Sequence, residues 1–151
     1  MHPYEVARAA AAAMYAADTA SQALGITLDE VAPGRATARM AVTDAMLNGH
    51  RIAHGGYVFL LADTAFAFAC NSYGDRTVAA GGDIVFLDPA RGGDVLTAEA
   101  VERARVGRSG VYDVTVRRTD GSVVAEMRGR SRTVGGSLLD PADPATPRAR
   151  P

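Results

Sequence analysis

The chain has 151 residues, a length that suits one domain with a substantial core, and 48% of them are hydrophobic and 22% charged. Its formal net charge is −1, so bulk charge does not favour nucleic acid as a partner. No stretch of 18 apolar residues is free of charge, so the sequence predicts no membrane span and no membrane partner.

The N-terminal part predicts one helix followed by two strands. An Ala-rich helix is expected over Pro3–Ala23, with proline at its start and Gly25 as its stop. Strands are expected over Ile26–Ala32 and Arg35–Val42, because apolar and polar residues alternate in the second of them. Pro33–Gly34 between them is a typical turn pair.

A long apolar stretch, Tyr57–Cys70, follows the polar loop 43–53 and predicts a buried helix. The glycine pair Gly55 and Gly56 precedes it, and Asp63 is its only charged residue. A helix that starts near Gly55 directs free N–H groups at the space before it, where negative charge is stabilised. A carboxylate within an apolar helix is costly unless it is paired, protonated or used in chemistry.

The rest of the chain predicts an antiparallel meander. Four strands are expected over Thr77–Leu87, Val95–Val106, Val111–Arg118 and Val123–Val134. Gly81–Gly82 within the first of them indicates a bulge, and Asp120–Gly121 indicates a hairpin turn before the last.

These elements predict an α+β fold in which a curled antiparallel sheet wraps around one long central helix, with an additional N-terminal helix. We expect a single domain over residues 1–136 and a Pro-rich, disordered tail over residues 137–151. The open edges of such a sheet favour pairing between protomers. Cys70 is the only cysteine, which excludes an intrachain disulfide and fits a cytoplasmic location.

Several motifs resemble the hotdog-fold acyl-CoA thioesterases of the phenylacetic acid degradation type. They are Asn48-Gly-His, His54-Gly-Gly, Leu61-Ala-Asp-Thr-Ala, Asp83-Ile-Val-Phe-Leu-Asp-Pro, Gly93-Asp-Val-Leu and Gly107-Arg-Ser-Gly-Val-Tyr-Asp-Val. The resemblance covers about Tyr4 to Val134 and implies the hotdog fold. It also implies a homodimer that assembles into a homotetramer, with coenzyme A bound across the protomer interface.

The resemblance assigns a catalytic role to Asp63, either as a nucleophile toward the thioester carbonyl or as a general base toward water. Gly55 is the expected oxyanion donor through its backbone N–H, with Gly56 as the alternative. Asn48 and Thr64 match positions that orient water or substrate in similar enzymes, although a turn residue and a helix residue bonded to its own backbone are the alternatives.

His54 completes the candidate catalytic set and is expected to shape the loop in its neutral form. His50 and His54 are four residues apart, but no Glu lies between them, so the sequence does not contain a zinc-protease motif and we expect no metal. No Gly-x-Ser-x-Gly elbow is present to support a serine triad.

Arg108 and Ser109 lie in a glycine-flanked loop that is a candidate site for the phosphates of coenzyme A, with a solvated hairpin loop as the alternative. Coenzyme A enters only as part of the substrate, and no bound cofactor is expected.

The resemblance favours hydrolysis of an aryl- or arylacetyl-CoA, with phenylacetyl-CoA or a ring-hydroxylated form as first substrate. Phe59, Phe66 and Phe68 are expected to supply an aromatic wall for the acyl group. Two alternatives use the same fold: a non-catalytic acyl-CoA sensor, and a hydratase or dehydratase that pairs Asp63 with His54.

Overall fold

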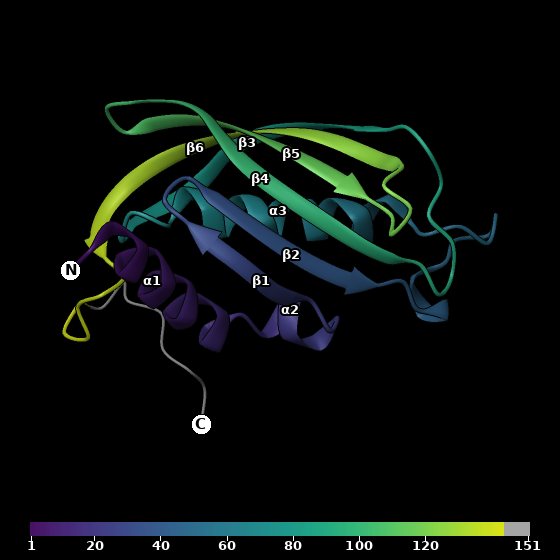
Figure 1. Ribbon diagram of the computed structural model, residues 1–151, viewed down its shortest axis with the longest axis horizontal. Helices are drawn as coiled ribbons and strands as arrows, with labels where there is room; N and C mark the ends of the chain where they lie inside the picture. Colours follow the sequence, from purple (N-terminus) through teal and green to yellow (C-terminus); the bar gives the residue numbers. More distant parts are fainter. Residues whose placement is uncertain (144–151) are drawn as a thin grey trace.

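The computed structural model describes residues 1–143, which form one six-stranded antiparallel sheet curved over a central helix (Figure 1). In chain order the elements are α1 Pro3–Ala17, α2 Thr19–Ala23, β1 Thr27–Ala32, β2 Arg35–Ala41, a 3-10 turn Asp44–Met46, α3 Gly55–Cys70, β3 Asp75–Phe86, β4 Val95–Val106, β5 Ser109–Arg117 and β6 Val123–Ser137. The α+β hotdog architecture expected from the sequence is therefore confirmed.

The N-terminal helix is split in two, which corrects the single helix expected over Pro3–Ala23. The break is at Asp18, whose backbone N–H donates to Tyr15 O and whose side chain accepts from Ser21 N at 2.9 Å. Asp18 therefore ends α1 and caps α2, because a short acidic side chain satisfies the free N–H groups of a helix start.

The strand order is β1-β2-β4-β5-β6-β3, so the expected meander holds only for β4, β5 and β6. β3 pairs with β6 and lies at the far edge of the sheet, away from β4. The expectation was wrong for β3 because α3 carries the chain from β2 to the opposite edge, and the connection over residues 87–94 brings it back to β2 and β4. Because this pairing joins segments far apart in the sequence, the alternation of residues within one strand does not predict its partner.

Both glycine signals within the sheet are confirmed. The register between β3 and β6 shifts between Ala79 and Gly81, as expected for a bulge. Gly121 has φ +86° in the turn between β5 and β6, a left-handed conformation that favours glycine.

One face of α3 packs against the sheet and forms the core. Leu61, Ala62, Ala65 and Ala69 have no exposed surface, and the Phe66 ring lies against the backbone of β6 at Gly129. The opposite face remains partly exposed in the single chain, and we call it the open strip of α3. It consists of Gly56, Phe59, Leu60, Asp63 and Ala67.

Ordered structure continues past residue 136, where the domain was expected to end. β6 reaches Ser137, and Leu138 is buried and donates its N–H to Gly74 O at 2.8 Å. The boundary at residue 136 was therefore too early, because the last turn of chain is held against the loop after α3. Residues 144–151 lie outside the described residues, and their disorder stays a prediction. Within residues 1–143, no helix has the length and apolar character that crossing a membrane requires.

Candidate active site

The N-terminus of α3 presents one free backbone N–H. His54 is the N-cap, and its Nδ1 accepts a hydrogen bond from Gly56 N–H at 3.0 Å. Tyr57 N–H donates to His54 O at 3.0 Å. Within residues 1–143, the Gly55 N–H has no protein acceptor. Of the two glycines, Gly55 is therefore the one able to donate to a ligand, since Gly56 is already engaged.

Asn48 folds the loop before α3 and keeps its amino group free. Its Oδ1 accepts from His50 N–H at 2.9 Å and from Ile52 N–H at 3.4 Å. The two donors fix the orientation of the amide, so Nδ2 is left without an acceptor among the described residues. Arg51 has φ +61°, a strained conformation that the tight loop imposes on a non-glycine residue.

Asn48 and Gly55 line the same cavity, which has a volume of about 480 Å³ and a mostly apolar wall. The other lining residues are Ile52, Ala53, Val58, Phe86, Leu87, Asp88, Pro89, Ala90 and Val124. The Phe86 ring lies so close to Gly55 that an added Cβ would be 2.9 Å from its Cζ. A free N–H donor at the wall of an apolar cavity is an arrangement suited to holding an acyl oxygen.

The aromatic wall expected from α3 is largely wrong. Phe66 and Phe68 are 1% and 2% exposed, and they pack against Tyr112 and Tyr15 in the core. Both rings are enclosed in the core, so of the three phenylalanines only Phe59, on the open strip, is partly exposed. The aromatic side chain of the cavity is Phe86, from the end of β3. Sequence analysis missed its role, although Phe86 lies within one of the motifs that carry the family resemblance.

Asp63 is half-buried on the open strip rather than enclosed, and it has no hydrogen bond or ion pair within residues 1–143. Burial raises the pKa of its carboxyl above the usual 3.8, and the nearby charge of Asp18 raises it further. An unpaired carboxylate with a raised pKa is suited to accept a proton.

The raised pKa of Asp63 has a consequence for stability. Because its pKa is higher in the folded than in the unfolded chain, the contribution of Asp63 favours folding at acidic pH and is lost as pH rises through the folded pKa. Asp63→Asn is therefore expected to melt at a higher temperature than the wild type at pH 7, with the difference vanishing below the ordinary Asp pKa. Calorimetry at pH 7 and under acid conditions measures this, and equal melting temperatures at pH 7 contradict it.

Thr64 is directed away from the cavity. Its Oγ1 lies 3.1 Å from Ser21 Oγ, and Ser21 Oγ donates to Asp18 Oδ2 at 2.6 Å. Since the single Ser21 proton goes to Asp18, the Thr64 hydroxyl is the donor in the first contact. The structure therefore connects Thr64 to the N-terminal cap of α2, and it holds Asp18 near Asp63.

Gly55 and Asp63 lie on one helix but too far apart to act on one carbonyl within a chain. They are separated by about 12 Å along the axis at about 1.5 Å per residue. Catalysis needs a donor about 3 Å from the carbonyl oxygen and a reacting atom about 3 Å from its carbon. The Asp side chain leans toward the helix N-terminus, but its length does not close this gap.

Arg108 and Ser109 are also remote from Gly55 in the single chain. With Cys70 and Tyr73 they line a narrow polar crevice at the C-terminal end of α3, whereas the cavity is at its N-terminal end. Arg108 is exposed, and Ser109 Oγ accepts from Arg132 Nη1 at 3.3 Å. Burial raises the pKa of the nearby Cys70 thiol to about 12, with Asp63 contributing, so this thiol is not a nucleophile at neutral pH.

Comparison with known proteins gives the family of the chain. The thioesterase superfamily profile matches residues 50–125. The chain is 46% identical to acyl-coenzyme A thioesterase PaaI of Escherichia coli over 86% of its own length and 93% of that protein. The structure of the E. coli PaaI protein from the phenylacetic acid degradation operon aligns with a TM-score of 0.87, at 45% identity over 89% of this chain and 97% of the other.

A Streptococcus mutans protein bound to acetyl CoA aligns with a TM-score of 0.71, at 26% identity over 74% of this chain and 90% of the other. The acyl-CoA thioesterase expected from the motifs is therefore confirmed at the level of the family. The chain belongs to the hotdog-fold acyl-CoA thioesterases of the PaaI type.

Proposed function

We propose that this protein hydrolyses an arylacetyl-CoA at a site formed by two copies of the chain. The observation that carries the proposal is the free Gly55 N–H at the wall of an apolar cavity, about 12 Å along α3 from the unpaired carboxylate of Asp63. A second copy, with its α3 antiparallel to the first, supplies the carboxylate that the cavity lacks. The proposed assembly is a homodimer, or a tetramer of such dimers.

The open strip of α3 supports this pairing. Phe59 is halfway between Gly55 and Asp63 in the sequence, so a two-fold axis near Phe59 brings each Gly55 beside Asp63 of the other copy. Pairing would also cover the partly exposed apolar side chains of the strip. The free edge of β3, where Val78 and Val85 are 42% and 57% exposed, supports strand pairing across the same axis.

In the proposed reaction the thioester oxygen accepts from Gly55 N–H, with Asn48 Nδ2 as second donor. Asp63 of the other copy takes a proton from water while the water oxygen attacks the carbonyl carbon. Collapse of the tetrahedral intermediate breaks the C–S bond, and the protonated Asp63 returns its proton to the leaving thiolate, so that the acid and the CoA thiol are released and the carboxylate is regenerated. The alternative route, in which Asp63 attacks directly and a mixed anhydride is then hydrolysed, uses the same groups.

The same two-fold axis moves the Arg108–Ser109 turn of the second copy toward the Gly55 cavity, since antiparallel helices place the C-terminal end of one beside the N-terminal end of the other. The proposed role of this turn is to bind the phosphates of coenzyme A. The acetyl CoA bound to the S. mutans relative supports coenzyme A as the carrier. The cytoplasmic location suggested by the single cysteine stays a prediction.

Two alternatives on the same fold are weaker. A hydratase that uses His54 as a base needs a free ring nitrogen, but Nδ1 accepts from Gly56 N–H and Nε2 of the neutral ring then carries the proton. A non-catalytic sensor needs only to bind acyl-CoA, and binding alone does not require an unpaired carboxylate with a raised pKa at Asp63.

A substrate panel tests the proposal. Release of free CoA thiol is measured with phenylacetyl-, hydroxyphenylacetyl-, hexanoyl- and palmitoyl-CoA. We expect the two arylacetyl esters to exceed the alkyl esters in kcat/KM, because the Phe86 ring and the limited volume of the cavity suit a flat, short acyl group. Preference for palmitoyl-CoA contradicts the arylacetyl assignment, and no thiol release from any ester contradicts the thioesterase.

A further inference from the structure

The wall of the Gly55 cavity opposite α3 is formed by the connection between β3 and β4, and this connection is not held by regular sheet pairing. Leu87, Asp88, Pro89 and Ala90 all line the cavity. The first two donate their N–H groups to Val124 O at 2.8 and 3.3 Å, as β3 pairing comes to an end. Beyond them the segment leaves the sheet, so something else must fix its position.

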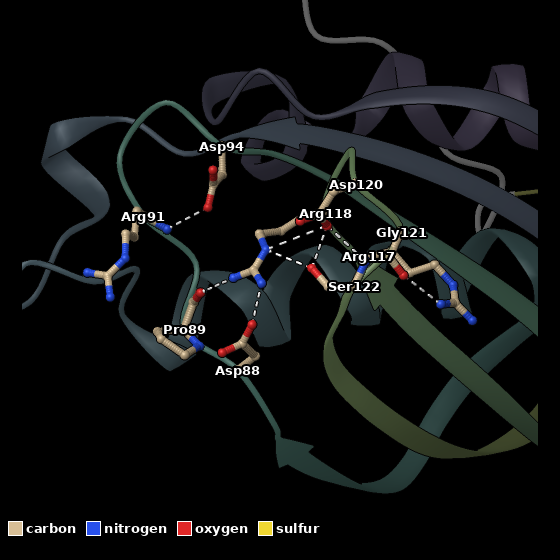
Figure 2. Close-up of polar contacts among 9 residues, drawn as sticks. All are labelled: Asp88, Pro89, Arg91, Asp94, Arg117, Arg118, Asp120, Gly121 and Ser122. Atoms are coloured by element: carbon tan, nitrogen blue, oxygen red, sulfur yellow. Dashed lines mark hydrogen bonds and ion pairs between the residues drawn. The ribbon is translucent and has the colours of Figure 1, made fainter.

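The side chain of Arg118, from the turn between β5 and β6, forms hydrogen bonds with this segment at Asp88 and Pro89 (Figure 2). Arg118 Nη1 donates to Pro89 O at 2.6 Å, and Nη2 donates to Asp88 Oδ2. The third nitrogen, Nε, donates to Ser122 Oγ at 2.9 Å and so ties the guanidinium to its own turn. The Arg118 side chain is 22% exposed, and its planar guanidinium donates to three different acceptors at once.

The position of this segment is transmitted to the oxyanion donor. Ala90 O, one residue after the carbonyl that Arg118 holds, accepts from Ala53 N–H at 2.7 Å. Ala53 lies two residues before Gly55, and the intervening His54 caps α3. The same segment therefore forms the acyl wall and supports the loop that orients the Gly55 N–H.

We infer that Arg118 is a positioning residue that sets the acyl specificity of the thioesterase, because it joins Asp88 and Pro89 to the β5–β6 turn and so fixes both the cavity wall and the Gly55 loop. The inference rests on the proposed function of the Gly55 cavity. Asp88 is its matching partner, and loss of either side chain frees the wall.

Arg117 provides a matched control. It is the preceding residue, the last of β5, and its Nη1 donates to Gly121 O at 2.9 Å. It is exposed, and in Figure 2 its side chain extends away from Asp88 and Pro89. Arg117→Met removes the same charge and the same length of side chain without releasing the cavity wall.

The test compares Arg118→Met, Arg118→Lys, Asp88→Asn and Arg117→Met with phenylacetyl-CoA and hexanoyl-CoA as substrates. In Arg118→Met we expect kcat/KM for phenylacetyl-CoA to fall by about 10- to 100-fold, as for an acyl group misplaced by about 1 Å. The preference for phenylacetyl- over hexanoyl-CoA should narrow by at least about 5-fold, because a looser wall discriminates less. Arg118→Lys should have a higher kcat/KM and a stronger preference than Arg118→Met, but lower than the wild type. The reason is that a single ammonium group replaces the several N–H donors of the guanidinium.

Two further readouts separate positioning from general damage. The acid limb of the kcat/KM pH profile should stay in place in Arg118→Met, because the pKa of Asp63 is raised by burial and by Asp18 and the bonds of Arg118 go to Asp88, Pro89 and Ser122. Asp88→Asn keeps Arg118 and its bond to Pro89 O but replaces the charged acceptor with a neutral amide oxygen. It should narrow the preference in the same direction by a smaller factor, and it tests the inference if Arg118→Met does not fold. The inference is overturned if Arg118→Met and Asp88→Asn prefer phenylacetyl- over hexanoyl-CoA as strongly as Arg117→Met does. That result would leave the thioesterase assignment intact. A wild-type protein without thioester hydrolysis overturns the proposed function itself.

Discussion

Asp63→Asn is expected to lower kcat by about 10²–10⁴-fold, the range typical for loss of a positioned base. The reason is the same in both routes, since asparagine neither accepts the proton of water nor attacks a thioester. KM should change far less, because the cavity wall and the Arg108–Ser109 turn do not include Asp63. Steady-state thiol release with phenylacetyl-CoA measures both constants.

Asp18→Asn is the matched control, because Asp18 is a neighbouring carboxylate without an assigned part in the chemistry. Its charge raises the pKa of Asp63, so its loss should move the acid limb of the kcat/KM profile to lower pH and leave the maximum kcat nearly unchanged. If Asp63→Asn keeps more than about a tenth of the wild-type kcat, the carboxylate is not the base and the mechanism fails.

Gly55→Pro is expected to lower kcat by about 10²–10³-fold, as for removal of one oxyanion donor. Proline deletes the N–H and is tolerated at the first position of a helix. His54 has φ −59° and ψ 132°, a conformation that a residue before proline adopts without strain. The substitution therefore removes the donor while keeping the backbone of α3.

Gly55→Ala supplies the comparison, because it adds the same Cβ against the Phe86 ring and keeps the N–H. Phe86 is 52% exposed, so its ring has room to move, and alanine should cost much less activity than proline. Equal losses in the two variants mean that crowding, and not the lost donor, explains the effect.

The central helix and its start were predictable because their signals are local. A continuous apolar run after a glycine pair indicates a buried helix that starts at Gly55, and the structure places the start there. The position of β3 in the sheet was not predictable, because its partner β6 lies about 50 residues further along the chain. The sequence pattern of an edge strand also does not differ from that of other strands. The break at Asp18 was missed because the Ala-rich composition outweighed one capping residue.

The candidate site was predictable in its residue types and only partly in its geometry. The choice of Gly55 over Gly56 depends on the His54 side chain folding back, which the sequence does not reveal. Arg117 and Arg118 are adjacent and chemically identical, yet only Arg118 reaches Asp88 and Pro89. The difference arises because Arg117 ends β5 whereas Arg118 begins the turn, so their side chains point in different directions. That boundary and those directions follow from tertiary structure rather than from local pattern.

The central claim is that Gly55 and Asp63 of different copies form each site, and mixed oligomers test it most directly. Asp63→Asn and Gly55→Pro chains carrying different affinity tags are co-expressed, and the mixed species is isolated. Each mixed dimer should contain one intact site, made from Gly55 of one chain and Asp63 of the other, and one site that lacks both groups. We expect about half of the wild-type activity per mixed dimer, although the two parent variants are each nearly inactive. A mixed dimer that is as inactive as its parents contradicts the shared site. That result would mean that Gly55 and Asp63 of a working site belong to the same chain.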